Sequence, residues 1–213
     1  LDDAIINVNT DFALDFPGTD EYISIPDHAD FDFGSGDFTV CAWIKTTQST
    51  STAVYFVAKY EDDAGSGDAW WGLQMLNNEY VAIHIDDGST DQRCDGTAVI
   101  NDGSWHHIAG VYDSGSTLKL YVDGVEQNSE SVGAINSDTA GSEPVQLGGP
   151  TGRGLGGQYG DYFNGQMADV RIYKGEAVSA TNIKILASKI NIDKTLGPGT
   201  TNLKGHWQLN ESS

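Results

Sequence analysis

Residues 105–124 constrain the fold of this chain more than any other stretch. Two runs rich in strand-forming residues, 105–112 and 118–122, flank the sequence Asp-Ser-Gly-Ser, a composition typical of a turn. In the second run, apolar side chains recur at every other position, at Leu118, Leu120 and Val122. This period of two places them on one face of a half-buried β-strand. The stretch therefore predicts an antiparallel hairpin.

Length and glycine content agree with a protein built from short strands. The chain has 213 residues, which suits a single all-β domain. Its 26 glycines against 5 prolines indicate many tight turns. We therefore expect strands joined by turns and few helices.

Three motifs, in the expected order, resemble the laminin G-like domains of the concanavalin A-like lectin and glucanase fold. They are Ala13–Phe16 with Tyr22–Ile25, Trp105–Ala109 with Leu118–Gly124, and Gly165–Tyr173. The similarity covers residues 10–187, and three ordered motifs are harder to obtain by chance than one. The resemblance implies an all-β fold, with two antiparallel sheets packed as a β-sandwich in a jelly-roll arrangement.

Apolar and alternating runs predict the other strands. They are 38–45, 54–59, 71–76, 80–85, 93–100, 145–147 and 163–173. The first of these alternates, and its apolar set from Phe38 to Ile44 is expected to meet the core. One short helix is expected near the C-terminus, over 179–189, with Ser179 as its N-cap.

The chain divides into two parts. Residues 1–190 form the laminin G-like domain, and residues 191–213 follow it with a linker-like Leu-Gly-Pro-Gly and a run that contains Trp207. This second part is either a linker with an edge strand of the same domain or the start of a following repeat. Because the chain begins with Leu1 and not Met, we expect it to be a piece of a longer protein.

The strongly acidic composition narrows the partners. Lys and Arg number 11 against 31 Asp and Glu, a formal net charge of −20. Such a surface repels phosphate backbones and anionic lipids, so no nucleic-acid partner is expected. The chain contains no run of 18 apolar residues and no signal peptide, so no membrane insertion is expected.

Cys41 and Cys94 could form one disulfide or stay as buried thiols, since a sequence does not place two sulfurs within bonding distance.

The resemblance implies a structural calcium ion. In the family, such an ion commonly lies between the loop after the first strand and the Asp before the Val-Arg-Ile-Tyr strand. The matching carboxylates are Asp20 and Asp169, with backbone carbonyls of Gly18 or Tyr22 nearby. Calcium takes six to eight oxygen ligands. The alternative is that both acids are ordinary turn residues that accept backbone N–H bonds.

A glycan site is the main functional hypothesis. Sugars present an apolar C–H face and a rim of hydroxyls, so their sites need an exposed aromatic plane beside polar groups. Trp70 and Trp71 are consecutive and point to opposite faces of a strand; if Trp71 enters the core, Trp70 is left outward. Further ligand-binding residues are expected on adjoining strands and loops, at Asp68, Tyr80, His84, Arg93, Arg153, Tyr159, Asp161 and Tyr162. The alternative for Trp70 is a structural role, the commoner one for tryptophan on a sandwich strand.

Two other conspicuous motifs predict structure before chemistry. Residues 148–160 contain seven glycines but lack the Lys-Ser/Thr pair of a phosphate-binding loop. We expect a loop at the rim of the sandwich, which could gate a site.

His106 and His107 lie on opposite faces of a strand and cannot chelate one ion together. His107 aligns with a recurring strand histidine of the family, so a structural role is expected.

Enzymes also share this fold, but their motifs are not found. The glucanase branch carries Glu-x-Asp-x-Glu on one strand, which directs its carboxylates to one face, and no such run occurs here. The alginate-lyase branch needs a Gln-Ile-His strand and paired arginines, which Ile83-His84-Ile85 matches only in part. We therefore expect no catalytic residues.

Together, the residues and the resemblance predict a non-catalytic glycan-recognition module, stabilised by structural calcium, in a larger extracellular or surface-displayed protein. Its expected partners are a glycan or polysaccharide and other domains of the same parent chain. The alternative is a protein-binding or architectural module displayed on a cell or virion surface. A sugar binder should expose aromatics on the concave sheet or rim, whereas a structural module should bury Trp70 and Tyr159.

Overall fold

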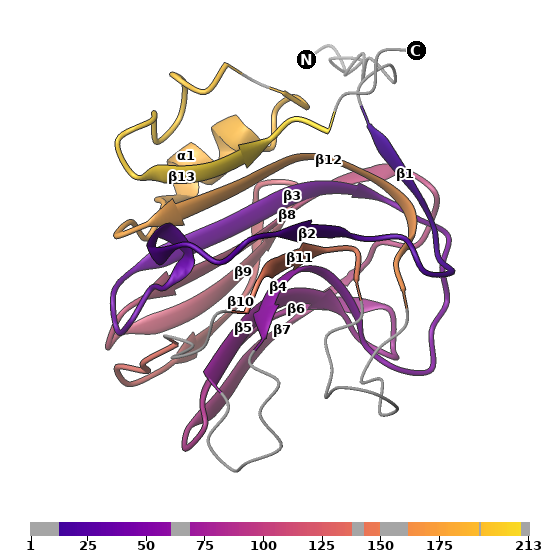
Figure 1. The fold of residues 1–213 in the computed structure, drawn as a ribbon. Coiled ribbons are helices and arrows are strands. Elements are labelled where there is room, and N and C mark those ends of the chain that lie inside the picture. Colours follow the sequence, from indigo (N-terminus) through magenta and orange to yellow (C-terminus); the bar gives the residue numbers. More distant parts are fainter. Residues whose placement is uncertain (1–12, 61–68, 138–142, 150–161, 192, 210–213) are drawn as a thin grey trace.

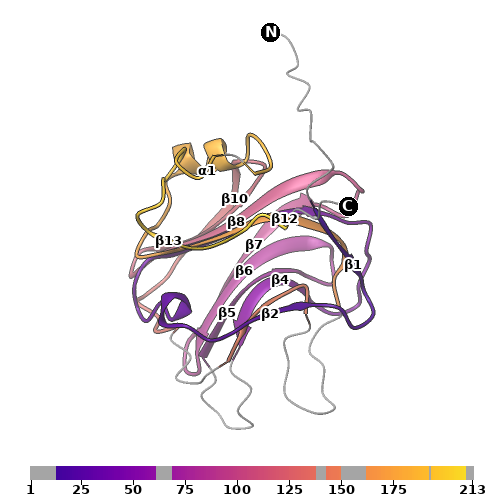
Figure 2. The ribbon, with the colours of Figure 1, turned by 45° about the horizontal axis from the view of Figure 1, so that its top comes forward.

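The described residues form two antiparallel sheets packed face to face (Figure 1). The computed structural model describes residues 13–60, 69–137, 143–149, 162–191 and 193–209. Both sheets arch in the same direction, and the helix lies on the convex side (Figures 1 and 2). The all-β sandwich expected from the sequence is therefore confirmed.

Sheet A is the seven-stranded sheet. Its strands, in spatial order, are β1 (Leu14–Pro17), β12 (Asn164–Lys174), β3 (Phe38–Lys45), β8 (Trp105–Asp113), β9 (Thr117–Val122) and β10 (Val125–Ser131). The seventh, β13 (Leu203–Trp207), pairs with Val170–Tyr173 of β12, next to the part of β12 that pairs with β1. The C-terminal segment thus contributes an edge strand to this domain.

Sheet B has six strands. In spatial order they are β2 (Ile23–Ile25), β11 (Val145–Leu147), β4 (Val54–Tyr60), β5 (Ala69–Met75), β6 (Tyr80–Asp87) and β7 (Asp91–Val99). All neighbouring pairs are antiparallel. Strands β5, β6 and β7 follow one another in two hairpins with short turns, whereas β2, β11 and β4 come from distant parts of the chain.

The core lies between the two sheets and follows the period of two. Phe38, Val40, Ala42 and Ile44 of β3 are completely buried in it, as the alternation predicts. Trp71 faces them from β5 and is also completely buried. Its ring and that of Phe38 both pack against Phe33, with centroids 5.0 Å and 4.3 Å from it. Aromatic burial of this size dominates the energetics of a small core.

The helix α1 (Ala180–Leu186) covers the outer face of sheet A. Ser179 caps it, as expected, by accepting a hydrogen bond from the backbone N–H of Asn182 at 3.3 Å. Ile183 and Leu186 are buried against the outward side chains of the sheet, in a cluster with Cys41, Val111, Tyr121 and Tyr173. The only other helical element in the described residues is the 3-10 turn η1 (Ala29–Phe31).

One strand was not expected from the sequence. Strand β10 has the sequence Val-Glu-Gln-Asn-Ser-Glu-Ser and its side chains are mostly exposed. It lies at the edge of sheet A, where it needs no apolar face and where charged residues discourage edge-to-edge pairing. Its backbone pairing with β9 therefore left no hydrophobic pattern to detect.

Cys41 and Cys94 are free and buried. They lie in different clusters, since Cys94 belongs to the main core and Cys41 to the cluster under α1. Among the described residues, the model contains no helix long and apolar enough to cross a membrane.

The two adjacent histidines of β8 have opposite surroundings. His107 is 1% exposed, and its burial lowers its pKa to about 4. The ring nitrogens of His106 contact two carboxylates, Asp123 at 2.8 Å and Asp102 at 3.2 Å. The hydrogen bond to Asp123 raises the pKa of His106, although partial burial opposes it.

These shifts predict opposite effects of pH on stability. Between pH 6.5 and 4 the unfolded chain protonates His107 before the folded state does, so the His107 contribution is lost as pH falls through that window. His106 acts the other way: its contribution is present below pH 6.5 and is lost as pH rises through its raised folded pKa. In an NMR titration, His107 should remain neutral at pH 5.5, and Asp123→Asn should lower the midpoint of His106. A His107 midpoint near 6.5 would contradict this structure.

Gly110 of β8 tests how tightly the two sheets pack. A methyl group at this position would lie 2.6 Å from two side-chain carbons of Ile83 in the opposing sheet. Gly110→Ala should therefore lower the free energy of unfolding by about 1–3 kcal/mol, the usual cost of overpacking. Gly133→Ala is the matched control, because nothing lies within 4 Å of its added carbon. Equal urea midpoints for the two variants would mean that the sheets are not in close contact here.

Candidate functional site

The outer face of sheet B is the candidate site. Its side chains lie in rungs across the strands: Tyr60, Trp70, Asp86 and Asp91 occupy one rung, and Ala58, Gly72, His84 and Arg93 the next. No helix or strand of the described residues packs across this face, whereas α1 packs across sheet A (Figure 1). Sheet B therefore presents an uncovered face on the concave side of the molecule.

Trp70 lies at the centre of an aromatic cluster on this face. As predicted, Trp71 enters the core and Trp70 points outward. However, the ring of Trp70 is covered by its neighbours: centroids of His84, Tyr60 and Tyr55 lie 4.1, 5.4 and 6.0 Å away. Only 8% of Trp70 is exposed. The expectation of an open tryptophan plane is therefore wrong. Of the rings around it, Tyr55 is buried and Tyr60 and His84 are half-buried, so the accessible aromatic surface comes from Tyr60 and His84.

His84 is held in one orientation by partners on both neighbouring strands. Its Nε2 contacts the Asp91 carboxylate, and its Nδ1 lies 3.4 Å from the side-chain nitrogen of Gln74. Burial lowers its pKa, and the opposing effect of Asp91 does not overcome this. A neutral ring fits both contacts, because Nε2–H then donates to Asp91 and Nδ1 accepts from Gln74.

Arg93 and Asp95 form an ion pair at the edge of the cluster. The guanidinium donates from Nε to one carboxylate oxygen at 2.5 Å and from Nη2 to the other at 2.9 Å. Both side chains are more than 40% exposed. Tyr80, at the start of β6, is half-buried. The structure thus brings four predicted ligand residues onto one face: Trp70, Tyr80, His84 and Arg93.

Tyr162 occupies a separate place. Its ring lies 6.4 Å from that of Tyr22, and 47% of Tyr22 is exposed. Tyr22 adjoins Gly149 and Gln146 next to the β2–β11 edge of sheet B. The other four predicted ligand residues lie outside the described residues: Asp68, Arg153, Tyr159 and Asp161. So does most of the glycine-rich run 148–160.

Several residues of this face were not predicted. Tyr55, Tyr60 and Gln74 contact Trp70 or His84, and Asp91 and Asp95 hold His84 and Arg93. The alternation of β5 contains the signal for Gln74, which lies four residues from Trp70 and shares its face. Tyr55 and Tyr60 are five residues apart on β4, so alternation alone would place them on opposite faces; the β-bulge between Tyr55 and Val57 brings both to the outer face. The two acids could not be found in this way, since their proximity depends on the β6–β7 register.

The four residues expected to hold calcium do not fit that role in this structure. The Asp169 carboxylate receives the Arg171 guanidinium at 2.7 and 3.1 Å and the His206 ring at 2.8 Å. Pro17 pairs with Asn164, so Gly18 and Asp20 adjoin the start of β12, about 16 Å along the strand from Asp169. Asp20 is exposed. No three His, Cys, Asp or Glu side chains gather as metal ligands among the described residues.

Asp169 instead forms a buried ionic cluster that ties β13 to β12. Asp169 is 3% and Arg171 1% exposed. Burial by itself would raise the pKa of Asp169, but the hydrogen bonds from His206 and Arg171 lower it. The carboxylate is therefore ionised, and its charge offsets that of the buried guanidinium.

Asp169→Asn should destabilise the domain strongly. Removing one partner of a buried ion pair costs about 3–5 kcal/mol, because the other charge stays buried. Asp20→Asn, a change at an exposed turn, should stay within about 0.5 kcal/mol. The loss at Asp169 should be the same in excess calcium and in a chelator. A loss that appears only when calcium is present would instead place the ion at this carboxylate.

Most of the chain matches the sequence model of a known protein family. The laminin G-type model of the concanavalin A-like lectin/glucanases superfamily matches residues 17–184. The chain belongs to this superfamily. The matched range runs from Pro17, the last residue of β1, into α1, so the rest of β1 and the whole of β13, both in sheet A, lie outside it. No curated protein matches the chain.

Solved structures with the same fold include parts of enzymes and of a laminin chain. Domain 4 of an extracellular arabinanase from Geobacillus stearothermophilus, in complex with arabinotriose, has a TM-score of 0.61 at 22% identity, over 82% of this chain and 76% of that one. The CBM40 module of a Ruminococcus gnavus sialidase, bound to α2,3-sialyllactose, has a TM-score of 0.61 at 18% identity, over 82% and 98%. Domains LG4-5 of the mouse laminin α1 chain have a TM-score of 0.59 at 17% identity, over 84% and 46%.

Proposed function

We propose that this laminin G-like domain is a non-catalytic module that binds a neutral oligosaccharide on the outer face of sheet B. The observation that carries the proposal is the aromatic cluster around Trp70 on a sheet face that no described helix or strand covers. Its exposed border consists of Tyr60, His84 and Arg93. A sugar ring can lie against such aromatic edges while its hydroxyls bond to the polar groups beside them.

The polar groups are held in place before a ligand arrives. Gln74 and Asp91 fix the His84 ring, and Asp95 fixes the Arg93 guanidinium in a two-point contact. Preorganised side chains lose less conformational entropy on binding. This arrangement therefore favours a defined oligosaccharide unit over loose contact with a polymer.

Charge favours a neutral glycan. Asp86, Asp91 and Asp95 surround the single cation Arg93 on this part of the face, within a chain of net charge −20. An anionic sugar would meet repulsion here. Of the two saccharide-bound relatives, the arabinotriose complex is the nearer chemical analogue, because sialyllactose carries a carboxylate.

The proposal includes an extracellular or surface-displayed parent protein, with other domains of that chain as partners. The relatives of known structure include part of an extracellular arabinanase and part of a laminin chain. Both support an extracellular or surface-displayed parent protein. Catalysis is not part of the proposal: Asp91 pairs with His84, Asp95 pairs with Arg93, and Asp86 accepts a hydrogen bond from the backbone N–H of Gly88.

One observation favours a second candidate, a protein-binding or architectural module. Trp70 is 8% exposed, and a structural tryptophan should be buried in this way. In that case the cluster stabilises the outer face of sheet B and the binding partner is a protein. The two candidates predict different outcomes for substitutions that remove polar contacts without unfolding the domain.

Glycan-array binding of the parent domain and three variants separates these candidates. Arg93→Ala and Tyr60→Ala should each weaken binding to neutral oligosaccharides at least about tenfold, the loss expected for a charge-assisted hydrogen bond or a stacking contact. Lys119→Ala is the control, because Lys119 is a partly exposed cation that also pairs with an acid, Glu126, but on sheet A. If the domain bound no glycan, or if Lys119→Ala lost as much affinity as the other two variants, the protein-binding or architectural module would be the better candidate.

A further inference from the structure

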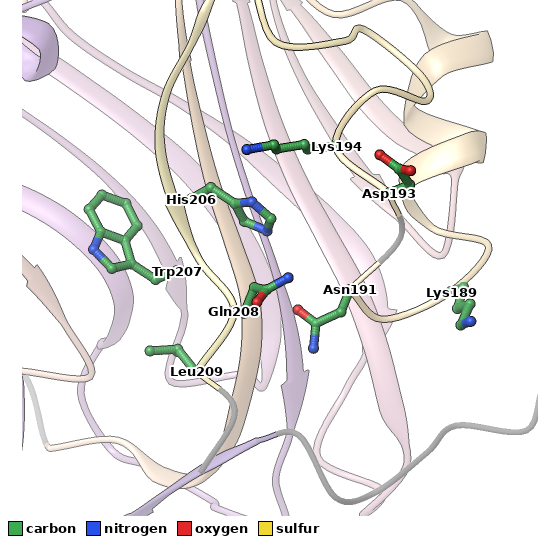
Figure 3. Close-up of a pocket in the computed structure, with 8 residues that line it drawn as sticks. All are labelled: Lys189, Asn191, Asp193, Lys194, His206, Trp207, Gln208 and Leu209. Atoms are coloured by element: carbon green, nitrogen blue, oxygen red, sulfur yellow. The ribbon is translucent and has the colours of Figure 1, made fainter. Parts of the chain in front are cut away.

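A second hollow lies at the opposite sheet, beside the C-terminal strand. Its volume is about 880 Å³, and it is lined by Lys189, Asn191, Asp193 and Lys194, which follow α1, and by residues 206–209 of the β13 segment. In Figure 3, His206 and Gln208 project toward Asn191 and Asp193, whereas Trp207 and Leu209 project to the other side. The side chains directed into the hollow are therefore all polar.

The hollow contains an unsatisfied acceptor. The side-chain oxygen of Asn191 is buried and has no hydrogen-bond partner among the described residues. A buried acceptor without a donor costs about 1–3 kcal/mol. A ligand hydroxyl or amide would remove that cost, so the hollow is suited to a hydrogen-bond donor.

Unusual backbone conformations gather at the same place. The described residues include five non-glycine residues with positive φ, and three of them are Asp169, Asn191 and Leu209, at 49°, 53° and 51°. Asn191 and Leu209 line the hollow. Asp169 lies behind it, bonded to His206 and, through its N–H at 3.3 Å, to the carbonyl of Gln208. Such conformations cost free energy and cluster at ligand sites.

The charge of this region is opposite to that of the rest of the molecule. Residues 169–209 carry six Lys and Arg against three acids, Asp169, Glu176 and Asp193, in a chain of net charge −20. Lys189 and Lys194 line the hollow. One Asp193 carboxylate oxygen already accepts two hydrogen bonds from Thr195, at 2.8 and 2.9 Å. The local field therefore favours an anion.

We propose that this hollow binds a small polyhydroxylated carboxylate, the chemistry of a uronic acid unit. Lys194 meets the carboxylate, and the Asn191 oxygen and the Gln208 amide bond to hydroxyls. The site is separate from the outer face of sheet B and does not depend on its function. It would give the domain two surfaces that select glycans of different charge.

NMR titration of the isotope-labelled domain with glucuronate, glucose and acetate tests this site. Glucuronate should shift the amides of residues 189–194 and 206–209 to saturation, and neither glucose nor acetate should match its affinity, because each supplies half of the recognised chemistry. Equal affinity for acetate would mean an unspecific anion site and would overturn the assignment. Equal affinity for glucose, or no shift at these amides, would also overturn it.

Matched lysine variants identify the contact. Lys194→Ala should weaken glucuronate binding by about tenfold, the loss expected for a hydrogen bond to a charged group, and Gln208→Ala by about fivefold, the loss expected for a neutral hydrogen bond. Lys204→Ala removes the same charge from β13, but Lys204 does not line the hollow, so its affinity should stay within about twofold. If Lys194→Ala and Lys204→Ala lost the same affinity for glucuronate, the binding would reflect general electrostatic attraction, and the proposed contact with Lys194 would be wrong. Binding of a neutral oligosaccharide to sheet B should be unchanged in all three variants.

Discussion

Burial of one alternate set of side chains between the two sheets is the constraint on which the rest of the structure depends. Once Trp71 and Ile83 are fixed in the core, Trp70 and His84 must lie on the outer face of sheet B. The same rule gives His106 and His107 opposite surroundings on β8. The packing of the core therefore determines which side chains reach the outer faces of the sheets. Only these outward side chains are free to vary with function.

The two outer faces serve different purposes. Sheet A is covered by α1, and the buried cluster of Asp169, Arg171 and His206 ties the last strand to it. Sheet B has an outer face on which aromatic rings and oriented polar groups meet. Residues 169–209, which contribute α1 and β13 on the side of sheet A, carry six Lys and Arg against three acids, whereas Asp86, Asp91 and Asp95 lie on the outer face of sheet B. Both proposed ligands follow from this separation.

The sequence predicted the core more reliably than the site. Strand β3 and the hairpin of β8 and β9 were found because burial on one face leaves a period of two. Strand β10 was missed because an exposed edge strand leaves no such pattern. The side to which Trp70 points was predictable, but its coverage by Tyr55, Tyr60 and His84 depends on strand register. For the same reason the family motif suggested calcium at Asp169 in β12, whereas Arg171 of the same strand and His206 of β13 occupy this carboxylate.

The most direct test of the central claim is a crystal structure of the domain with a neutral oligosaccharide that it binds. The account predicts a sugar ring on the outer face of sheet B, against Tyr60 and the edge of Trp70, with its hydroxyls within hydrogen-bonding distance of His84 or Arg93. A sugar bound only elsewhere, such as beside Tyr22 and Tyr162 or on sheet A, would contradict it. The aromatic cluster would then be a structural feature of the sheet and the function would lie on another surface.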